Sequence, residues 1–92
     1  GNFGWDDVGS WLAVGRIKKN DDNSNVINGN VVAVNTRGCV IEGGEKLIAT
    51  VGLRDIVVVD TKDATLITTK ENAGEIKQVL AKLREEGKNE YL

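Results

Sequence analysis

The sequence predicts one small, mainly β domain with flanking helices. Between residues 26 and 70, short runs of valine, isoleucine and threonine alternate with glycine, asparagine and aspartate. β-Branched residues favour the pleated surface of a strand, and turn residues between such runs mark corners. After residue 72 the pattern changes to that of an amphipathic helix. Ninety-two residues are enough for one domain with a modest core.

The first expected element is a short helix within residues 1–17. One face of this helix carries residues at the i, i+3, i+4, i+7 spacing: Val8, Trp11, Leu12 and Gly15. Asp7 or Ser10 can cap it, because both side chains accept hydrogen bonds from backbone N–H groups. Residues 18–25, "KKNDDNSN", are polar and rich in turn formers, which predicts a surface loop.

Residues 26–70 are expected to form a compact β unit of five or six strands of four to six residues. The runs that carry this prediction are "NVVAV", "CVIE", "LIATV", "IVVVD" and "ATLITT". Glycines supply the corners between them: Gly29, Gly38, Gly43, Gly44 and Gly52. A small sheet and the coils of a β-solenoid both fit, since the spacing follows no strict hexapeptide repeat.

Residues 72–92 are expected to form an amphipathic helix and a tail that pack on the β unit. The apolar stripe of this helix consists of Ile76, Val79, Leu80 and Leu83. Asn72 and Glu75 have the spacing of a capping box, and Gly87 stands where a helix-ending glycine belongs.

Composition excludes several classes of function. The net charge is −2 and there is no basic block, so the chain lacks the electrostatic pattern of a nucleic-acid-binding protein. No apolar run approaches the length of a membrane span. The chain contains no histidine, which removes Ser-His and Cys-His catalytic pairs and histidine-based zinc sites.

The cysteine and methionine content bears on the setting of the chain. Cys39 is the only cysteine, so an internal disulfide is impossible, which agrees with a cytoplasmic location. Cys39 lies in an apolar run with no base nearby, so inert packing is expected. The chain has no methionine and begins Gly-Asn-Phe-Gly, and we therefore expect it to be a piece of a longer protein.

Two groups of aspartates are candidates for chemistry. Asp55, Asp60 and Asp63 lie at the ends of expected strands, where aspartates usually bond to backbone amides in turns. The stretch "FGWDDVGSW" is different, because it gathers both tryptophans and the only phenylalanine around Asp6 and Asp7. An aspartate held beside glycine and tryptophan can present a carboxylate to Mg²⁺. Alternatively, Asp7 caps the following helix and Asp6 is solvated.

The chain resembles the C-terminal region of bacterial mannose-1-phosphate guanylyltransferases (GDP-mannose pyrophosphorylases), within the sugar nucleotidyltransferase superfamily. The stretches that carry the resemblance are "FGWDDVGSW", "NVINGNVVAVNT", "GLRDIVVVDTKDATLI" and the terminal helix closing on "EYL". The family joins GTP and mannose 1-phosphate to give GDP-mannose and pyrophosphate, with Mg²⁺ neutralising the phosphates. The resemblance implies that residues 1–17 end the catalytic domain and that residues 26–70 form a short, irregular left-handed β-helix-like unit.

The resemblance also implies roles for single residues. Asp7 matches the family's metal ligand, and Asp6 lies in the outer coordination sphere at most. The residues that would support Asp7 are Trp5, Gly9, Ser10 and Trp11.

GTP and mannose 1-phosphate would bind through an N-terminal nucleotide-binding domain that this chain lacks, so the chain alone would be inactive. The resemblance further implies a homodimeric, cytoplasmic enzyme. Two alternatives remain open at this point, namely another sugar-phosphate nucleotidyltransferase and a stand-alone β structural or interaction module.

Overall fold

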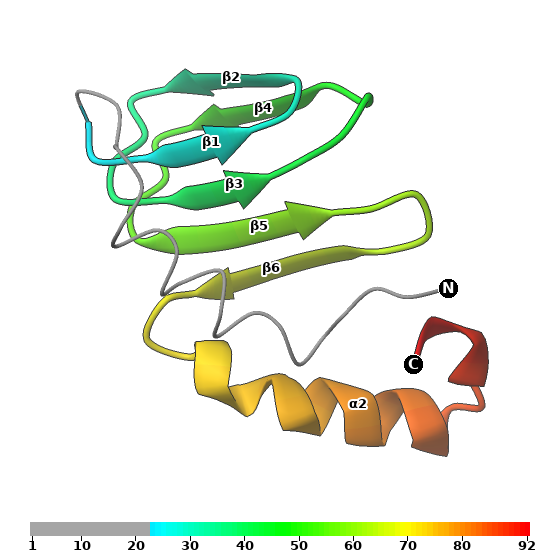
Figure 1. The fold of residues 1–92 in the computed structure, drawn as a ribbon. Helices are drawn as coiled ribbons and strands as arrows, with labels where there is room; N and C mark the ends of the chain where they lie inside the picture. The colour runs from blue at the N-terminus through cyan, green and yellow to red at the C-terminus, as the bar shows by residue number, and fades with distance from the viewer. Residues whose placement is uncertain (1–22) are drawn as a thin grey trace.

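A computed structural model of the chain describes residues 23–92 (Figure 1). Six short strands are followed by a helical C-terminal segment. The strands are β1 (Val26–Asn28), β2 (Val31–Val34), β3 (Val40–Glu42), β4 (Ile48–Val51), β5 (Ile56–Asp60) and β6 (Thr65–Thr69). The helical segment comprises a 3-10 turn (Ala73–Glu75), helix α2 (Ile76–Glu85) and a second 3-10 turn (Asn89–Tyr91).

The strands form the coils of a solenoid, which resolves the choice between a small sheet and a solenoid. One sheet has the order β1-β3-β5-β6 and the other contains β2 and β4. The pairs β1/β3, β3/β5 and β2/β4 are parallel, so each circuit of the chain returns in the same direction one strand further along. The fold class expected from the sequence, a β-helix-like unit followed by a helix, is confirmed. The strands are three to five residues long, slightly shorter than expected.

Successive coils differ in length because the second coil contains an insertion. Val40 lies 14 residues after its register partner Val26, whereas Val57 lies 17 residues after Val40. The Asn30 backbone N–H donates to the Gly44 carbonyl, and Val31 pairs with Ile48. The three extra residues are therefore Glu45 to Leu47. This unequal spacing explains why the sequence shows no regular repeat.

The two central strands of the four-stranded sheet, β3 and β5, are buried on both faces, which accounts for the continuous apolar run of β5. Inside the solenoid, Cys39, Ile41 and Val58 form one core cluster. On the opposite face, a second cluster joins strand residues to helix α2; its members are Val26, Val40, Val57, Val59, Leu66 and Ile76. Burying each of these aliphatic side chains contributes roughly 1.5–3 kcal/mol. Cys39 has no exposed surface, in agreement with the expected packing role.

A buried polar column crosses the solenoid interior next to the apolar cluster. The Asn25 side-chain amide donates to the Thr36 carbonyl (2.8 Å) and accepts from the Cys39 backbone N–H (2.9 Å). The Thr36 and Thr50 hydroxyls lie 2.8 Å apart in hydrogen-bond contact. Asn25 is only 2% exposed, so the prediction of a surface loop is wrong at this residue. Its amide is buried because it links two successive coils.

The corners of the coils are built from residues with left-handed backbone conformation. Ser24, Gly38 and Asp55 each stand two residues before a paired strand residue and have φ values of 63°, 67° and 55°. Their repetition at one position in three coils gives the solenoid a constant corner. Only glycine adopts this conformation without strain, and short polar residues adopt it more easily than others.

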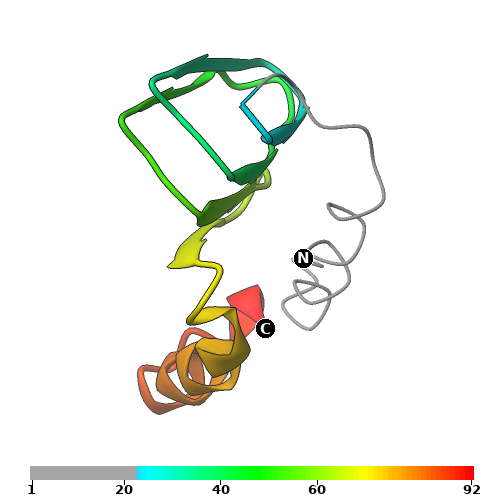
Figure 2. The same cartoon turned by 90° about the vertical axis from the view of Figure 1, so that its left-hand side faces the viewer.

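The solenoid ends with a reversal of chain direction. Strand β6 pairs antiparallel with β5, and α2 follows on the side of β6 away from β1 (Figures 1 and 2). Ile76 of α2 is buried and Leu80 and Leu83 pack against the core, but Val79, predicted to share this stripe, is 36% exposed.

The two ends of α2 match the sequence predictions differently. The capping-box prediction is wrong, because the 3-10 turn precedes α2 and the Asn72 side chain makes no cap bond; instead the Thr69 hydroxyl accepts from the Asn72 N–H. The C-terminal prediction is confirmed. Gly87 has φ +71°, its N–H bonds to the Arg84 carbonyl, and the Lys88 N–H bonds to the Leu83 carbonyl. These two bonds form a Schellman motif.

Candidate functional site

The predicted metal motif lies outside the described residues. All of its members precede residue 23, namely Trp5, Asp6, Asp7, Gly9, Ser10 and Trp11, and the expected N-terminal helix lies there too. The assignment of Asp7 to a metal therefore stays a prediction. Within residues 23–92, no group of three or more histidine, cysteine, aspartate or glutamate side chains is placed to hold a metal ion.

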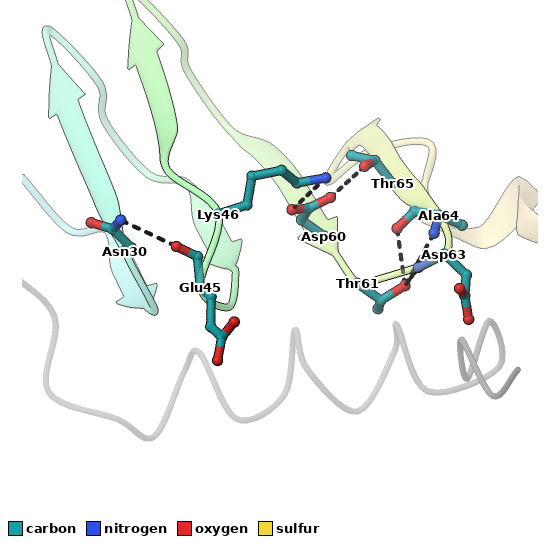
Figure 3. Close-up of polar contacts among 8 residues, drawn as sticks. All are labelled: Asn30, Glu45, Lys46, Asp60, Thr61, Asp63, Ala64 and Thr65. Atoms are coloured by element: carbon teal, nitrogen blue, oxygen red, sulfur yellow. Dashed lines mark hydrogen bonds and ion pairs between the residues drawn. The ribbon is translucent and has the colours of Figure 1, made fainter.

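One polar cluster in the solenoid is centred on Asp60, at the end of β5 (Figure 3). The Lys46 ammonium group lies 3.5 Å from the Asp60 carboxylate, and the Thr65 hydroxyl donates to the other carboxylate oxygen. The Asp60 side chain is only 6% exposed, whereas that of Lys46 is 67% exposed. A carboxylate this buried needs hydrogen-bonding or charged partners. Lys46 and Thr65 supply them, and they tie the inserted residues of the second coil to the β5–β6 hairpin.

The turn between β5 and β6 corrects the prediction made for the three later aspartates. It is the Thr61 hydroxyl that accepts from the turn amides of Asp63 (3.4 Å) and Ala64 (3.2 Å). The carboxylate of Asp60 binds side chains instead, as described above. Asp55 serves through its backbone, at the left-handed corner before β5. Asp55 and Asp60 therefore have structural roles, as expected, but in the β5–β6 turn the local backbone contact suggested for aspartate is made by Thr61.

The Asp60 cluster borders an open hollow of about 580 Å³. Its lining residues are Gly44, Glu45, Lys46, Asp60, Thr61 and Lys62. In Figure 3 the Lys46 side chain reaches across to Asp60, while the Glu45 carboxylate points away from both. The ammonium group of Lys46 is therefore engaged within the protein, and the hollow is best understood as the junction between the insertion and the final hairpin.

A second polar feature is a corner at which two arginines follow one another in successive coils. Arg37 and Arg54 form an isolated parallel bridge, and the Asp55 N–H bonds to the Arg37 carbonyl at 3.0 Å. Both side chains are exposed, and neither forms an ion pair with another of residues 23–92. Adjacent like charges weaken a pair of strands slightly. This corner is therefore a cationic end of the solenoid surface.

Sequence reasoning missed both of these polar features. The arginine corner had a recognisable signal, since Arg37 and Arg54 each stand three residues before a buried valine in "RGCV" and "RDIV". The Lys46–Asp60 pair had none, because the two residues belong to different coils and their approach depends on the length of the insertion. None of the helices described in residues 23–92 has the length and apolar character needed to cross a membrane.

The fold places the chain among short β-helix-like domains whose parallel coils are closed by an antiparallel strand and a helix. More specifically, the chain belongs to the MannoseP isomerase/GMP-like beta-helix domain family, whose model matches residues 29–83.

Comparison with known proteins gives relatives over almost the whole chain. The alginate biosynthesis protein AlgA of Pseudomonas putida is 44% identical over 87 residues, which are 95% of this chain and 18% of AlgA. The mannose-1-phosphate guanylyltransferase of Klebsiella pneumoniae is 36% identical over 87 residues, again 95% of this chain and 18% of that protein. This chain thus spans less than a fifth of the length of these curated relatives.

A solved structure shares the fold. The crystal structure of mannose-1-phosphate geranyltransferase from Thermus thermophilus superposes with a TM-score of 0.68 at 34% sequence identity. The match covers 85% of this chain and 24% of that one. The β-helix-like architecture is therefore also present in an experimentally determined relative.

Proposed function

We propose that this chain is the β-helix-like portion of a mannose-1-phosphate guanylyltransferase, which joins GTP and mannose 1-phosphate to give GDP-mannose and pyrophosphate. The observation that carries the proposal is an alignment with a protein of that name, which covers 95% of this chain but only 18% of that protein's length. The match to the Thermus thermophilus structure supports it, because a TM-score of 0.68 at 34% identity goes beyond a shared fold alone.

In this proposal the coils act as a scaffold for a catalytic domain elsewhere in the protein. The polar groups of the interior are fully paired: within residues 23–92, no buried side-chain nitrogen or oxygen lacks a hydrogen-bond partner. Such an interior gives a rigid unit. The nucleotide-binding domain of the parent protein would hold GTP and mannose 1-phosphate, and the chain alone would not turn over.

The contribution of this chain to catalysis would be the carboxylate of Asp7. Carboxylate oxygens are among the ligands that Mg²⁺ prefers, so the donor type fits the ion. Bound Mg²⁺ would neutralise charge on the phosphates during transfer of the guanylyl group. Trp5 and Trp11 would fix the position of Asp7 by packing, Gly9 would allow close approach of the backbone, and Ser10 would cap the helix that follows.

The test is pyrophosphate release by the complete polypeptide that carries this chain, with GTP and mannose 1-phosphate, over a range of Mg²⁺ concentrations. We expect Asp7→Asn to reduce the rate strongly and excess Mg²⁺ to restore part of it, because asparagine keeps the shape but loses the charge of the ligand. The matched control is Asp6→Asn, which removes the neighbouring charge and should leave the rate nearly unchanged.

Three results would count against parts of the proposal. Equal rates for wild type and Asp7→Asn would remove Asp7 from the metal site. A wild-type protein that uses another nucleotide or sugar phosphate in preference would place it elsewhere among the sugar nucleotidyltransferases. A complete polypeptide that transfers no nucleotide would favour a structural or interaction module.

A further inference from the structure

The cationic corner of the solenoid holds two arginines that have no acidic partner among residues 23–92. Arg37 and Arg54 occupy the same position in successive coils, just before β3 and β5, where these strands begin in Figure 1. Neighbouring strands lie about 4.8 Å apart, so the two guanidinium groups are anchored close to each other. Both side chains are exposed, and neither forms an ion pair with a residue that the structure describes. Two like charges at this spacing attract an anion to the corner.

Asp55 contributes a carboxylate to this corner but does not pair with either arginine. The corner contains an open hollow of about 260 Å³, lined by Asn23, Ser24, Arg37, Gly38, Arg54 and Asp55. The Asp55 carboxylate lies over Gly38, because a Cβ atom built on that glycine would come within 2.5 Å of the Asp55 Oδ1 atom. Within residues 23–92 this carboxylate forms no ion pair. The two guanidinium groups therefore keep their capacity to bind a further carboxylate.

The chain enters the described solenoid through the same corner. Asn23 stands in the first coil at the position that Arg37 and Arg54 occupy in the next two coils. The Asn23 carbonyl accepts a hydrogen bond from the Gly38 N–H at 3.2 Å, which holds Asn23 against the second coil. In the sequence, two acidic residues come directly before Asn23, namely Asp21 and Asp22. One residue spans at most about 3.6 Å, so both are anchored within about 7 Å of Asn23.

We propose that Asp21 and Asp22 bind the cationic corner and fasten the N-terminal segment of this chain to the solenoid. The planar guanidinium group of arginine matches the geometry of a carboxylate and donates to both of its oxygens. The order of charges in "KKNDDNSN" supports the proposal, because the two aspartates lie next to Asn23 and Lys18 and Lys19 lie further from the arginines. The inference goes beyond the proposed function, since it holds whatever reaction the complete protein catalyses.

This contact gives the chain a defined entry into the coils. One exposed ion pair contributes little to stability, but two carboxylates and two guanidinium groups form a network. Asn23 is already held by its backbone bond to Gly38, so only the two residues before it must be ordered to form the contact. The segment that contains the candidate metal ligand Asp7 then leaves the solenoid from a fixed corner.

Trypsin cleavage after Lys18 in the 92-residue chain, followed by mass spectrometry, tests the contact. A protease binds several extended residues on each side of the cleaved bond, so Asp21 must leave the corner before cleavage. The rate then follows the fraction of open chains. We expect the double variant Arg37→Gln with Arg54→Gln to be cleaved about fivefold faster, and added salt to speed cleavage of the wild type. The matched control is Arg84→Gln, which removes an exposed guanidinium group of α2 and should leave the rate unchanged.

A double-mutant cycle shows whether the arginines act through the two aspartates. The arginine substitutions are repeated in a chain that carries Asp21→Asn and Asp22→Asn, where they should no longer change the rate of cleavage. Comparison within each background removes any direct effect of the aspartates on trypsin. Circular dichroism and urea unfolding establish that the coils are intact in every variant. An equal increase in both backgrounds, or no increase in the chain with aspartates, would overturn the proposal.

A free anion is the competing occupant of the corner, and inorganic phosphate tests it. The probe is the NMR signal of the Nε–H group of each arginine. Phosphate should shift the signals of Arg37 and Arg54 more in the variant with Asp21→Asn and Asp22→Asn than in the wild type, because the carboxylates hold the arginines in the wild type. Equal shifts in the two proteins at the same phosphate concentration would show that the corner is open to anions from solution, which would overturn its assignment to Asp21 and Asp22.

Discussion

Gly29 is the position at which one methyl group best tests the stacking of the coils. Its φ is +98°, and a Cβ atom built on it would lie 2.6 Å from the carbonyl carbon of Gly43 in the next coil. The Gly43 N–H donates to the Asn28 carbonyl at 2.9 Å, which holds the two turns together. Gly29→Ala therefore forces the added Cβ atom against the backbone of Gly43. Gly52→Ala is the matched control, because φ there is +70° and nothing lies within 4 Å of the added atom.

The expected difference in the free energy of unfolding depends on two contributions common to both substitutions and one that applies to Gly29→Ala alone. Both place alanine in a left-handed conformation, at roughly 1–2 kcal/mol, and both restrict the unfolded chain by about 0.4–1 kcal/mol in the opposite sense. These terms largely cancel in the comparison. Gly29→Ala adds a clash comparable to overpacking a core, about 1–3 kcal/mol. We therefore expect it to be about 2 kcal/mol less stable than Gly52→Ala.

Thermal unfolding followed by circular dichroism measures this difference. For a domain of this size, about 2 kcal/mol corresponds to a difference in Tm of about 8–16 °C between the two variants. Urea unfolding at fixed temperature gives the free energies directly. Equal Tm values for the two variants, or a lower Tm for Gly52→Ala, would refute the close approach of the first and second coils at this turn.

Two further experiments probe the polar contacts of the solenoid. Asn25→Ala should lower the free energy of unfolding by about 2–3 kcal/mol, because the buried Thr36 carbonyl and Cys39 N–H lose their partner. The control Asn30→Ala removes one exposed 3.3 Å bond and should cost under about 1 kcal/mol. Similar urea unfolding curves for the two variants would contradict the buried role of Asn25. For the Asp60 cluster, a double-mutant cycle of Asp60→Ala and Thr65→Val should give a coupling of about 1 kcal/mol or more. Additive losses in that cycle would show that the two side chains do not interact.

The sequence was sufficient for the class of fold because local preferences and packing agree along most of the chain. The run from Ile56 to Val59 is apolar on both faces, and the structure buries both. The helix around Ile76 and its end at Gly87 were also predictable, since helix periodicity and a left-handed glycine are local signals. The start of this helix was not, because a 3-10 turn precedes it and neither Asn72 nor Glu75 caps it through its side chain.

Contacts between coils could not be predicted because they depend on register. In the sequence, Asn25 is a typical turn residue. It is buried because its side chain bonds to Thr36 in the first coil and to Cys39 at the start of the next coil. The Lys46–Asp60 pair likewise depends on the insertion of three residues. The candidate metal ligand Asp7 is the opposite case. It was predicted from a motif and a resemblance, but it precedes the residues that the structure describes.

The parallel coils also bear on how the chain reaches its folded state. Each parallel contact between neighbouring strands closes a segment of only 14 or 17 residues, so the entropy lost on adding a coil is small and nearly constant. A stack in which every coil touches only its neighbours can grow stepwise from whichever pair forms first. The chain contains no proline, so no isomerisation of prolyl bonds slows this growth. The antiparallel return of β6 then occupies the edge of β5 on which a further coil would pair, and this reversal terminates the stack at its C-terminal end.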